Sequence, residues 1–229
     1  MDAFAFIDLY CERTASGLWN EPLNALSNTA FVIAAGWAWL GYRRACGRSV
    51  DLLLIVLAGN IGIASLLFHT FATAWAELAD VIAIWVFAAA YTLVTVHRLC
   101  GENHKRSFAV LCMIGVVIWL IIPLTRELGF DSNENRWILN GSIQYLPALL
   151  LMLTFSIAMA MVKHPARWHF ILCTLIFLAA LVFRTIDLMA CSTTFGVGTH
   201  FIWHLLNATM IGLLLHLQIK YLAAQEQSP

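Results

Sequence analysis

Residues 51–69 read DLLLIVLAGNIGIASLLFH, an almost unbroken apolar run that begins at Asp51 and ends at His69. A helix needs about 20 apolar residues to cross the hydrocarbon core of a bilayer. The run meets this requirement, so we expect a membrane-spanning helix that ends close to Ser65 and His69.

Six further segments have the same apolar character. The chain of 229 residues is 61% hydrophobic and 11% charged, whereas soluble domains contain about 25% charged residues. We therefore predict an all-α membrane protein in which residues 1–229 form one seven-transmembrane helix bundle. Its helices are expected at 23–42, 51–69, 79–98, 107–125, 142–162, 168–188 and 200–220. The net charge of zero gives no reason to expect a nucleic-acid partner.

The basic residues between these segments predict the orientation of the bundle. Lys and Arg side chains concentrate on one side of the predicted membrane, at positions 43, 44, 48, 98, 105, 106, 163, 167 and 220. The other side carries only Arg13, Arg126 and Arg136. Because cytoplasmic loops are enriched in basic residues, we expect the N-terminus outside the cell and the C-terminus in the cytoplasm.

Three histidines and two companions then fall at one depth, in the outer half of the membrane. His69 ends the second segment, Asp80 opens the third, and His200 and His204 open the last. Residues four apart share a helix face, which pairs His200 with His204 and Ser65 with His69. Each histidine alone is as consistent with a buried hydrogen bond as with a ligand. Three histidines at a common depth in the membrane favour a metal site. Three imidazole ligands are also the ligand set of a catalytic zinc.

A zinc ion with an open fourth position predicts hydrolytic chemistry, because it activates water and polarises a carbonyl group. Asp80 is the candidate general base for that water. Ser65 is the candidate donor of a hydrogen bond to an oxyanion. Ser65 as a nucleophile is the weaker alternative, because no G-x-S-x-G elbow surrounds it. Copper, nickel and iron also bind imidazole, so the ligands alone do not fix the metal.

Four blocks of sequence carry a resemblance to a known family. They are Tyr10-Cys11-Glu12, the stretch EPLNALSN at 21–28, Ser65-x3-His69-x10-Asp80 and His200-x3-His204. The chain resembles the alkaline ceramidases, a group of seven-helix membrane hydrolases related to the progestin/adiponectin receptors. The resemblance implies zinc ligands at the three histidines and catalytic roles for Ser65 and Asp80. It also implies hydrolysis of the amide that links a fatty acid to a sphingoid base.

The resemblance further implies a calcium site in the segment before the first helix. Glu12 and Glu21 match carboxylate ligands of the family, and Tyr10 would offer its backbone carbonyl. Calcium takes six to eight oxygen ligands, so Asp8 would have to join them. The alternative is that Glu12 and Glu21 cap the first helix, where acidic residues favour the positive end of the dipole.

Two further pairs are predicted near the outer end of the bundle. Of six cysteines, only Cys11 and Cys191 fall on the oxidising side. A disulfide between them is permitted and agrees with the resemblance, and two free thiols are the alternative. Arg184 and Asp187 are three residues apart on one helix, which predicts an ion pair. A role for this pair in binding substrate is the second interpretation.

The sequence thus predicts a zinc-dependent membrane amidohydrolase acting on ceramide-like lipids, with the lipid reaching the site from within the bilayer. A receptor or signalling protein with a structural zinc is the main alternative, and a hydrolase of another N-acyl lipid is the second. The compact loops favour a bacterial inner membrane, with the active site in its outer half. Nothing in the sequence defines the oligomeric state.

Overall fold

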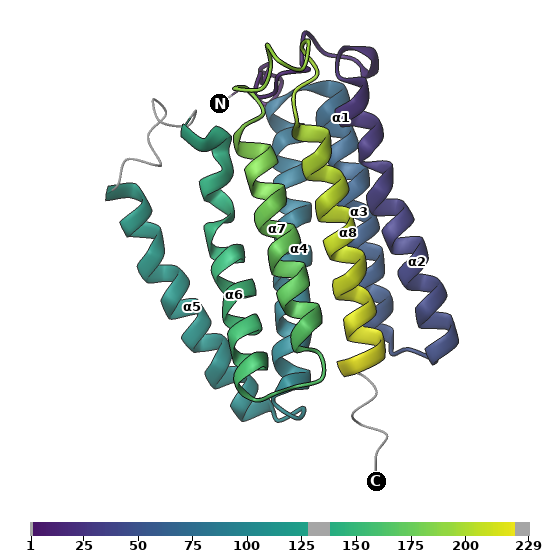
Figure 1. Cartoon of the computed structure of the whole chain (residues 1–229), viewed down its shortest axis with the longest axis vertical. Coiled ribbons are helices and arrows are strands. Elements are labelled where there is room, and N and C mark those ends of the chain that lie inside the picture. Colours follow the sequence, from purple (N-terminus) through teal and green to yellow (C-terminus); the bar gives the residue numbers. More distant parts are fainter. Residues whose placement is uncertain (1, 128–137, 223–229) are drawn as a thin grey trace.

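The computed structural model describes residues 2–127 and 138–222, and for 121–127 and 138 it describes the backbone alone. The helices run side by side along the long axis of the molecule, and loops join them at the two ends (Figure 1). The elements in chain order are η1 (Leu18–Asn20), α1 (Pro22–Ser27), α2 (Thr29–Ala45), α3 (Ser49–Phe71), α4 (Ala74–Leu99), α5 (His104–Glu127), η2 (Ile138–Tyr145), α6 (Leu146–Met161), α7 (Arg167–Thr185), α8 (His200–Leu217) and η3 (Gln218–Leu222).

Five helical stretches in the described residues are long and apolar enough to cross a membrane. They are Ser49–Phe71, Ala74–Leu99, Leu139–Met161, Arg167–Thr185 and His200–Leu222. Their outward faces expose large apolar side chains, including Ile63, Leu93, Ile157 and Leu175. Such faces are unfavourable in water and suit the hydrocarbon of a bilayer. The fold is therefore that of a multi-pass membrane protein, as the composition predicts.

The first predicted segment, 23–42, is divided rather than continuous. It forms the short helix α1 and the longer α2, with Asn28 between them. The side chains of Ser27 and Asn28 both donate to the backbone carbonyl of Asn24, at 2.9 and 2.8 Å. Side chains that compete for backbone groups in this way interrupt a helix. The junction packs tightly on α3, because a Cβ on Gly62 would lie 2.8 Å from the Asn28 carbonyl oxygen.

Several other helix ends differ from their predicted positions. Helix α4 begins at Ala74, so Asp80 lies in its second turn and not at its start. The segment predicted at 142–162 begins as the irregular η2, in which Leu139, Asn140 and Gly141 have positive φ. Helix α6 follows it, with a proline in its first turn. A proline at this position lacks only an N–H that the helix would not use.

The packing order places α3 and α8 at the centre of the bundle. Helix α3 packs between α2 and α4, and α8 packs against α2 and α7. Helix α6 lies beyond α7, and α5 packs mainly on α4 at the side of the bundle (Figure 1). The two central helices therefore carry the side chains that meet inside the protein.

A buried ion pair closes the end of the bundle at which α3 begins and α8 ends, called here the far end. Arg98 lies 2.8 Å from Asp51 and also donates to Gln218, at 2.9 Å from Oε1. Gln218 in turn donates to Thr95. This cluster joins α3, α4 and the end of α8, and its charges have partners within the protein.

Candidate metal centre

The opposite end of the bundle, called here the metal end, brings together the three predicted histidines. His69 lies near the end of α3, and His200 and His204 occupy the first two turns of α8. One ligand atom from each lies within 4.8 Å of those from the others. All three side chains are buried, with exposed fractions of 1–2%. Within residues 2–127 and 138–222, no other group of three or more His, Cys, Asp or Glu side chains is arranged to hold a metal.

The hydrogen bonds of the histidines test whether this cluster fits a metal ion. Nδ1 of His69 lies 2.8 Å from Glu21, and Nδ1 of His204 lies 2.7 Å from the Ser27 hydroxyl. Buried ring atoms Nε2 of His69 and Nδ1 of His200 have no hydrogen-bond partner. Metal-binding histidines have this pattern, with one nitrogen held by a neighbour and the other left for the ion. The cluster could therefore hold a metal ion, whose identity the geometry leaves open.

Ser65 and Asp80, the residues predicted to be catalytic, also lie at the metal end. Ser65 lies one turn before His69 on α3, and Asp80 faces it from α4. Their side chains are hydrogen-bonded to each other, and both are buried. Oδ1 of Asp80 has no hydrogen-bond partner. Asp80 thus keeps one carboxylate oxygen available beside the cluster, while Ser65 fixes the orientation of the side chain.

Glu21 has a role in the centre that the sequence did not suggest. Its carboxylate accepts hydrogen bonds from Nε and Nη2 of Arg13, at 3.0 and 2.8 Å, besides its contact with His69. Burial raises the pKa of Glu21 to about 7, against the opposing effect of the Arg13 guanidinium. Arg13, Glu21 and His69 therefore form a buried chain that orients the imidazole. Glu21 and His69 are 48 positions apart, so no local pattern could reveal the contact.

The other residues predicted to bind calcium have different surroundings. Glu12 accepts the backbone N–H groups of Leu23 and Asn24, each at 2.8 Å, and so caps α1. The carbonyl of Tyr10 accepts the N–H of Arg13, and Asp8 is exposed. The capping alternative therefore holds for Glu12, and Glu21 is engaged by Arg13 and His69. Calcium binding itself stays a prediction.

The aromatic ring of Tyr10 belongs to the metal end. It stacks on His200 with a centroid distance of 3.8 Å and lies 5.1 Å from the ring of His69. Burial raises the pKa of Tyr10, so the phenol keeps its proton at neutral pH. The N-terminal segment thus covers the histidines with a neutral ring.

The predicted ion pair between Arg184 and Asp187 does not form. Asp187 instead accepts the backbone N–H groups of Cys11, Thr199 and His200, at 2.9, 2.7 and 2.9 Å. Three donors satisfy the carboxylate and hold the start of α8 against the N-terminal segment. The loop approaches so closely that a Cβ on Gly198 would lie 2.2 Å from Asp187 Oδ1. Arg184 lies elsewhere, among aromatic rings.

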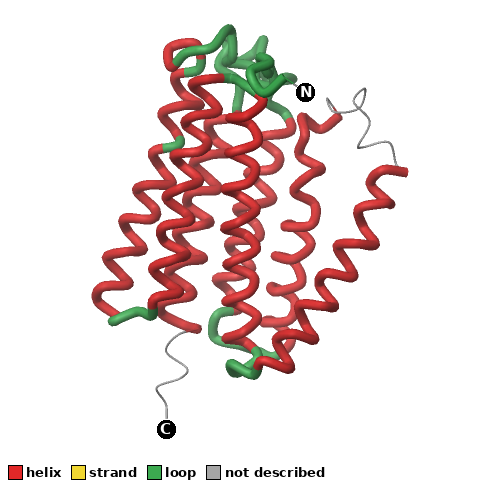
Figure 2. Tube along the Cα trace, turned by 180° about the vertical axis from the view of Figure 1, so that it is seen from behind, coloured by secondary structure: helices red, strands yellow, loops and turns green. Residues whose placement is uncertain are grey.

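The disulfide prediction is confirmed. Cys11 and Cys191 are bonded, which links the N-terminal segment to the loop between α7 and α8. Both segments lie at the metal end (Figure 2). The disulfide and Asp187 thus hold the same two segments over the histidines.

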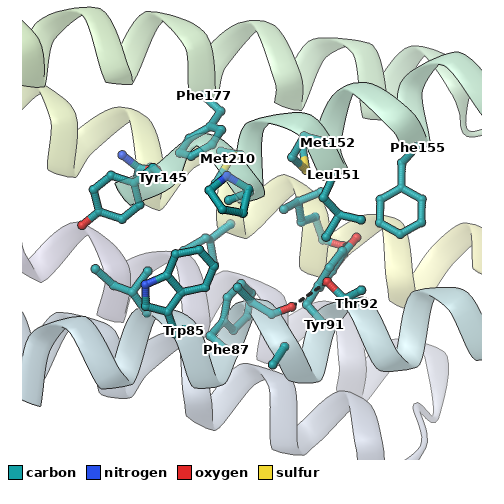
Figure 3. A pocket seen from close by; sticks show the side chains of 18 of the residues that line it. Trp85, Phe87, Tyr91, Thr92, Tyr145, Leu151, Met152, Phe155, Phe177 and Met210 are labelled. Carbon is teal, nitrogen blue, oxygen red and sulfur yellow. Dashed lines mark hydrogen bonds between the residues drawn. The ribbon is translucent and has the colours of Figure 1, made fainter. Parts of the chain in front are cut away.

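An apolar cavity of about 390 Å³ lies inside the bundle beneath the histidines. Figure 3 shows it extending from Tyr145 and Trp85 at one end to Phe155 and Thr92 at the other. Trp203, one residue before His204, lines it, and so does Phe31, whose ring meets the edge of the His204 ring. Along α8 the lining continues to Leu214, which is about 16 Å at 1.5 Å per residue. The cavity therefore begins beside the histidines and runs toward the far end.

Comparison with known proteins adds no assignment to this geometry. No protein-family model matches the chain, and no curated protein matches its sequence.

Proposed function

We propose that the protein is a zinc-dependent integral-membrane amidohydrolase that cleaves the N-acyl bond of ceramide-like lipids. The observation that carries the proposal is a buried three-histidine cluster next to an apolar cavity, which is lined by Trp203 and Phe31, the neighbours of His204. Cavities of about 300–1,000 Å³ are typical of small-molecule sites. The resemblance to the alkaline ceramidases supports the same reaction and the same residues.

The chemistry is divided among the metal and the side chains around it. When bound, zinc would polarise the substrate carbonyl and lower the pKa of a water molecule to about 7. Asp80, with its free oxygen, is suited to take a proton from the attacking water and return it to the leaving amine. Ser65 keeps Asp80 in place through their hydrogen bond. Glu21 and Ser27 hold two of the imidazoles in orientation.

The cavity is suited to the acyl chain of such a lipid. Its lining is almost entirely apolar, and α5 contributes Leu111, Ile114 and Ile118, while α6 contributes Pro147 and Leu151. These two helices lie at the side of the bundle (Figure 1). The proposed route for the lipid is therefore sideways from the bilayer into the cavity.

The proposed orientation has seven spans, the N-terminus outside and the C-terminus in the cytoplasm. Three loops at the far end carry most of the basic side chains, which face the cytoplasm under the positive-inside rule. The metal end then lies in the outer half of the membrane, and we infer a bacterial inner membrane. Arg136, one of the three basic residues assigned to the outer side, lies outside the described residues.

The test combines metal analysis with product identification. The protein purified in detergent is analysed for bound metals and incubated with ceramide, N-palmitoylethanolamine and N-palmitoylglycine, and released fatty acid is measured by mass spectrometry. We expect one zinc per chain and fatty acid release from at least one lipid, absent in His69→Ala. Stoichiometric zinc without release from any amide would overturn the enzyme and favour a receptor with a structural zinc.

A further inference from the structure

Three arginines are buried in the described residues, and they differ in their partners. Arg13 is paired with Glu21 at 2.8 Å, and Arg98 with Asp51 at the same distance. Arg184, with an exposed fraction of 5%, has no carboxylate within ion-pair distance among the described residues. Asp80 is near enough to interact with it through charge alone, and is hydrogen-bonded to Ser65.

The guanidinium of Arg184 is held by aromatic rings in place of an anion. Its Cζ atom lies 5.7 Å from the ring centroid of Tyr10, 5.3 Å from Tyr145 and 5.4 Å from Trp203. Nη1 has a long contact of 3.4 Å with the Tyr10 hydroxyl, and the buried Nε atom has no hydrogen-bond partner. A buried charge with no carboxylate in contact is destabilising. Such a group is expected to meet an anion during function.

The same rings define where that anion would lie. Tyr145 and Trp203 line the cavity at the end nearest the histidines, and Tyr10 stacks on His200. Arg184 therefore contacts both the rings that line this end of the cavity and the ring that stacks on His200. A lipid with its acyl chain in the cavity would bring its scissile carbonyl to this junction.

We propose that Arg184 is a catalytic residue that binds the carbonyl oxygen of the scissile amide. This inference rests on the proposed function. The water oxygen bonds to the carbonyl carbon, and the displaced electron pair moves onto the carbonyl oxygen, where the guanidinium stabilises it. The pair then returns as the C–N bond breaks. Both protons of the water end on the nitrogen, which leaves a fatty-acid carboxylate and an ammonium ion. Arg184 then pairs with the carboxylate of this product.

Two substitutions separate the charge of Arg184 from its packing. Arg184→Gln removes the charge, and Arg184→Lys keeps the charge but loses the planar fork of donors. Loss of one donor to an oxyanion lowers kcat by about 10²–10³-fold. We expect a decrease of this size in Arg184→Gln, with zinc content and KM little changed, and partial rescue in Arg184→Lys. The matched control is Arg106→Gln, an exposed residue at the far end, which should leave activity unchanged.

A binding measurement tests the same residue without turnover. Metal-free protein is heated with palmitate or with palmitamide, which has the same chain but no charge. We expect palmitate to raise the Tm more than palmitamide, and this difference to vanish in Arg184→Gln. Equal stabilisation by the two ligands in the wild type would overturn the inference, and so would a joint loss of Tm, zinc and activity in both variants.

The two measurements also separate this inference from the proposed function. Absence of hydrolysis with a palmitate preference that depends on Arg184 would sink the amidohydrolase and keep the carboxylate site. Hydrolysis that is unaffected in Arg184→Gln would keep the amidohydrolase and remove Arg184 from the reaction.

Discussion

The two ends of the bundle both bury charged and polar side chains, but they use them differently. At the far end, the Arg98 guanidinium has the carboxylate of Asp51 and the amide oxygen of Gln218. At the metal end, buried atoms of His69, Asp80 and Arg184 have no hydrogen-bond partner. At the far end, Oδ1 of Asp51 lacks a hydrogen bond but lies 2.8 Å from Arg98, and Nδ1 of His169 has no hydrogen-bond partner either. Buried polar atoms are normally satisfied in folded proteins. The ion pair of Arg98 and Asp51 therefore stabilises the contact between helices at the far end. The metal end is suited to bind ligands from outside the chain.

The largest expected effect is the loss of a histidine at the metal end. In His204→Ala only two imidazoles remain, so we expect zinc to be lost and hydrolysis to fall below detection. The chain should still fold, because its apolar core is unchanged. Metal analysis, fatty-acid release and thermal unfolding in detergent measure the three outcomes. The control is His216→Ala on the same helix, where the histidine stacks on Trp37 away from the centre. Full zinc content in His204→Ala would contradict the centre as described.

The far end should respond in the opposite way. Arg98→Met leaves Asp51 as a buried charge without its cation, with only the backbone N–H of Arg48 still bonded to it, which lowers the free energy of unfolding by about 3–5 kcal/mol. Zinc content of the folded protein should not change. The double variant Asp51→Leu/Arg98→Met should recover most of the stability, because apolar residues can replace a buried ion pair at little cost.

Denaturant unfolding in mixed micelles measures these differences. Arg184→Gln at the metal end leaves no paired carboxylate behind, so it should cost much less stability than Arg98→Met. An equal decrease in the free energy of unfolding in the two variants would mean that Arg184 stabilises the fold as much as Arg98 does. The proposed difference between the two ends would then be wrong.

An intermediate effect is expected at Glu21. Residues that orient a metal-binding histidine change metal affinity by about 10–100-fold when substituted. Glu21→Gln keeps the size of the side chain but weakens the contacts with His69 and Arg13. We expect zinc affinity to fall within this range, as measured by competition with a chelator. Glu12→Gln is the matched control, because Glu12 contacts backbone N–H groups and no histidine. Unchanged affinity in Glu21→Gln would remove it from the centre.

The difference between the ends also explains what could be predicted from the sequence. Apolar runs of sufficient length predicted the five helices that could cross a membrane, because a helix satisfies its backbone hydrogen bonds within its own segment. Spacing of four residues paired His200 with His204, since both lie on one face. The disulfide between Cys11 and Cys191 followed from topology and the resemblance. These features depend on local pattern or on depth alone.

The features that were missed depend on contacts between distant segments. Asp187 looked like the partner of Arg184 because a helix brings such residues together. In the fold, α7 ends at Thr185, and Asp187 accepts the N–H groups of Thr199 and His200 at the start of α8 and of Cys11 in the N-terminal segment. Glu21 looked like a calcium ligand or a cap, and its contact with His69 requires α3 to pack against the N-terminal segment. Loop geometry of this kind leaves no periodic signal in the chain.

The smallest expected effect concerns Glu12 and decides the calcium prediction. Its carboxylate accepts two N–H groups at the start of α1, and loss of a helix cap costs about 0.5–2 kcal/mol. We therefore expect Glu12→Ala to lower the Tm by the same small amount with and without calcium. A cation that binds only the folded protein would raise its Tm through mass action. If calcium stabilises the wild type and the increment disappears in Glu12→Ala, the carboxylate binds the cation and its capping contacts are secondary. Asp8→Asn separates the two cases further, because Asp8 is exposed and its substitution is expected to remove the calcium increment only if Asp8 binds the cation.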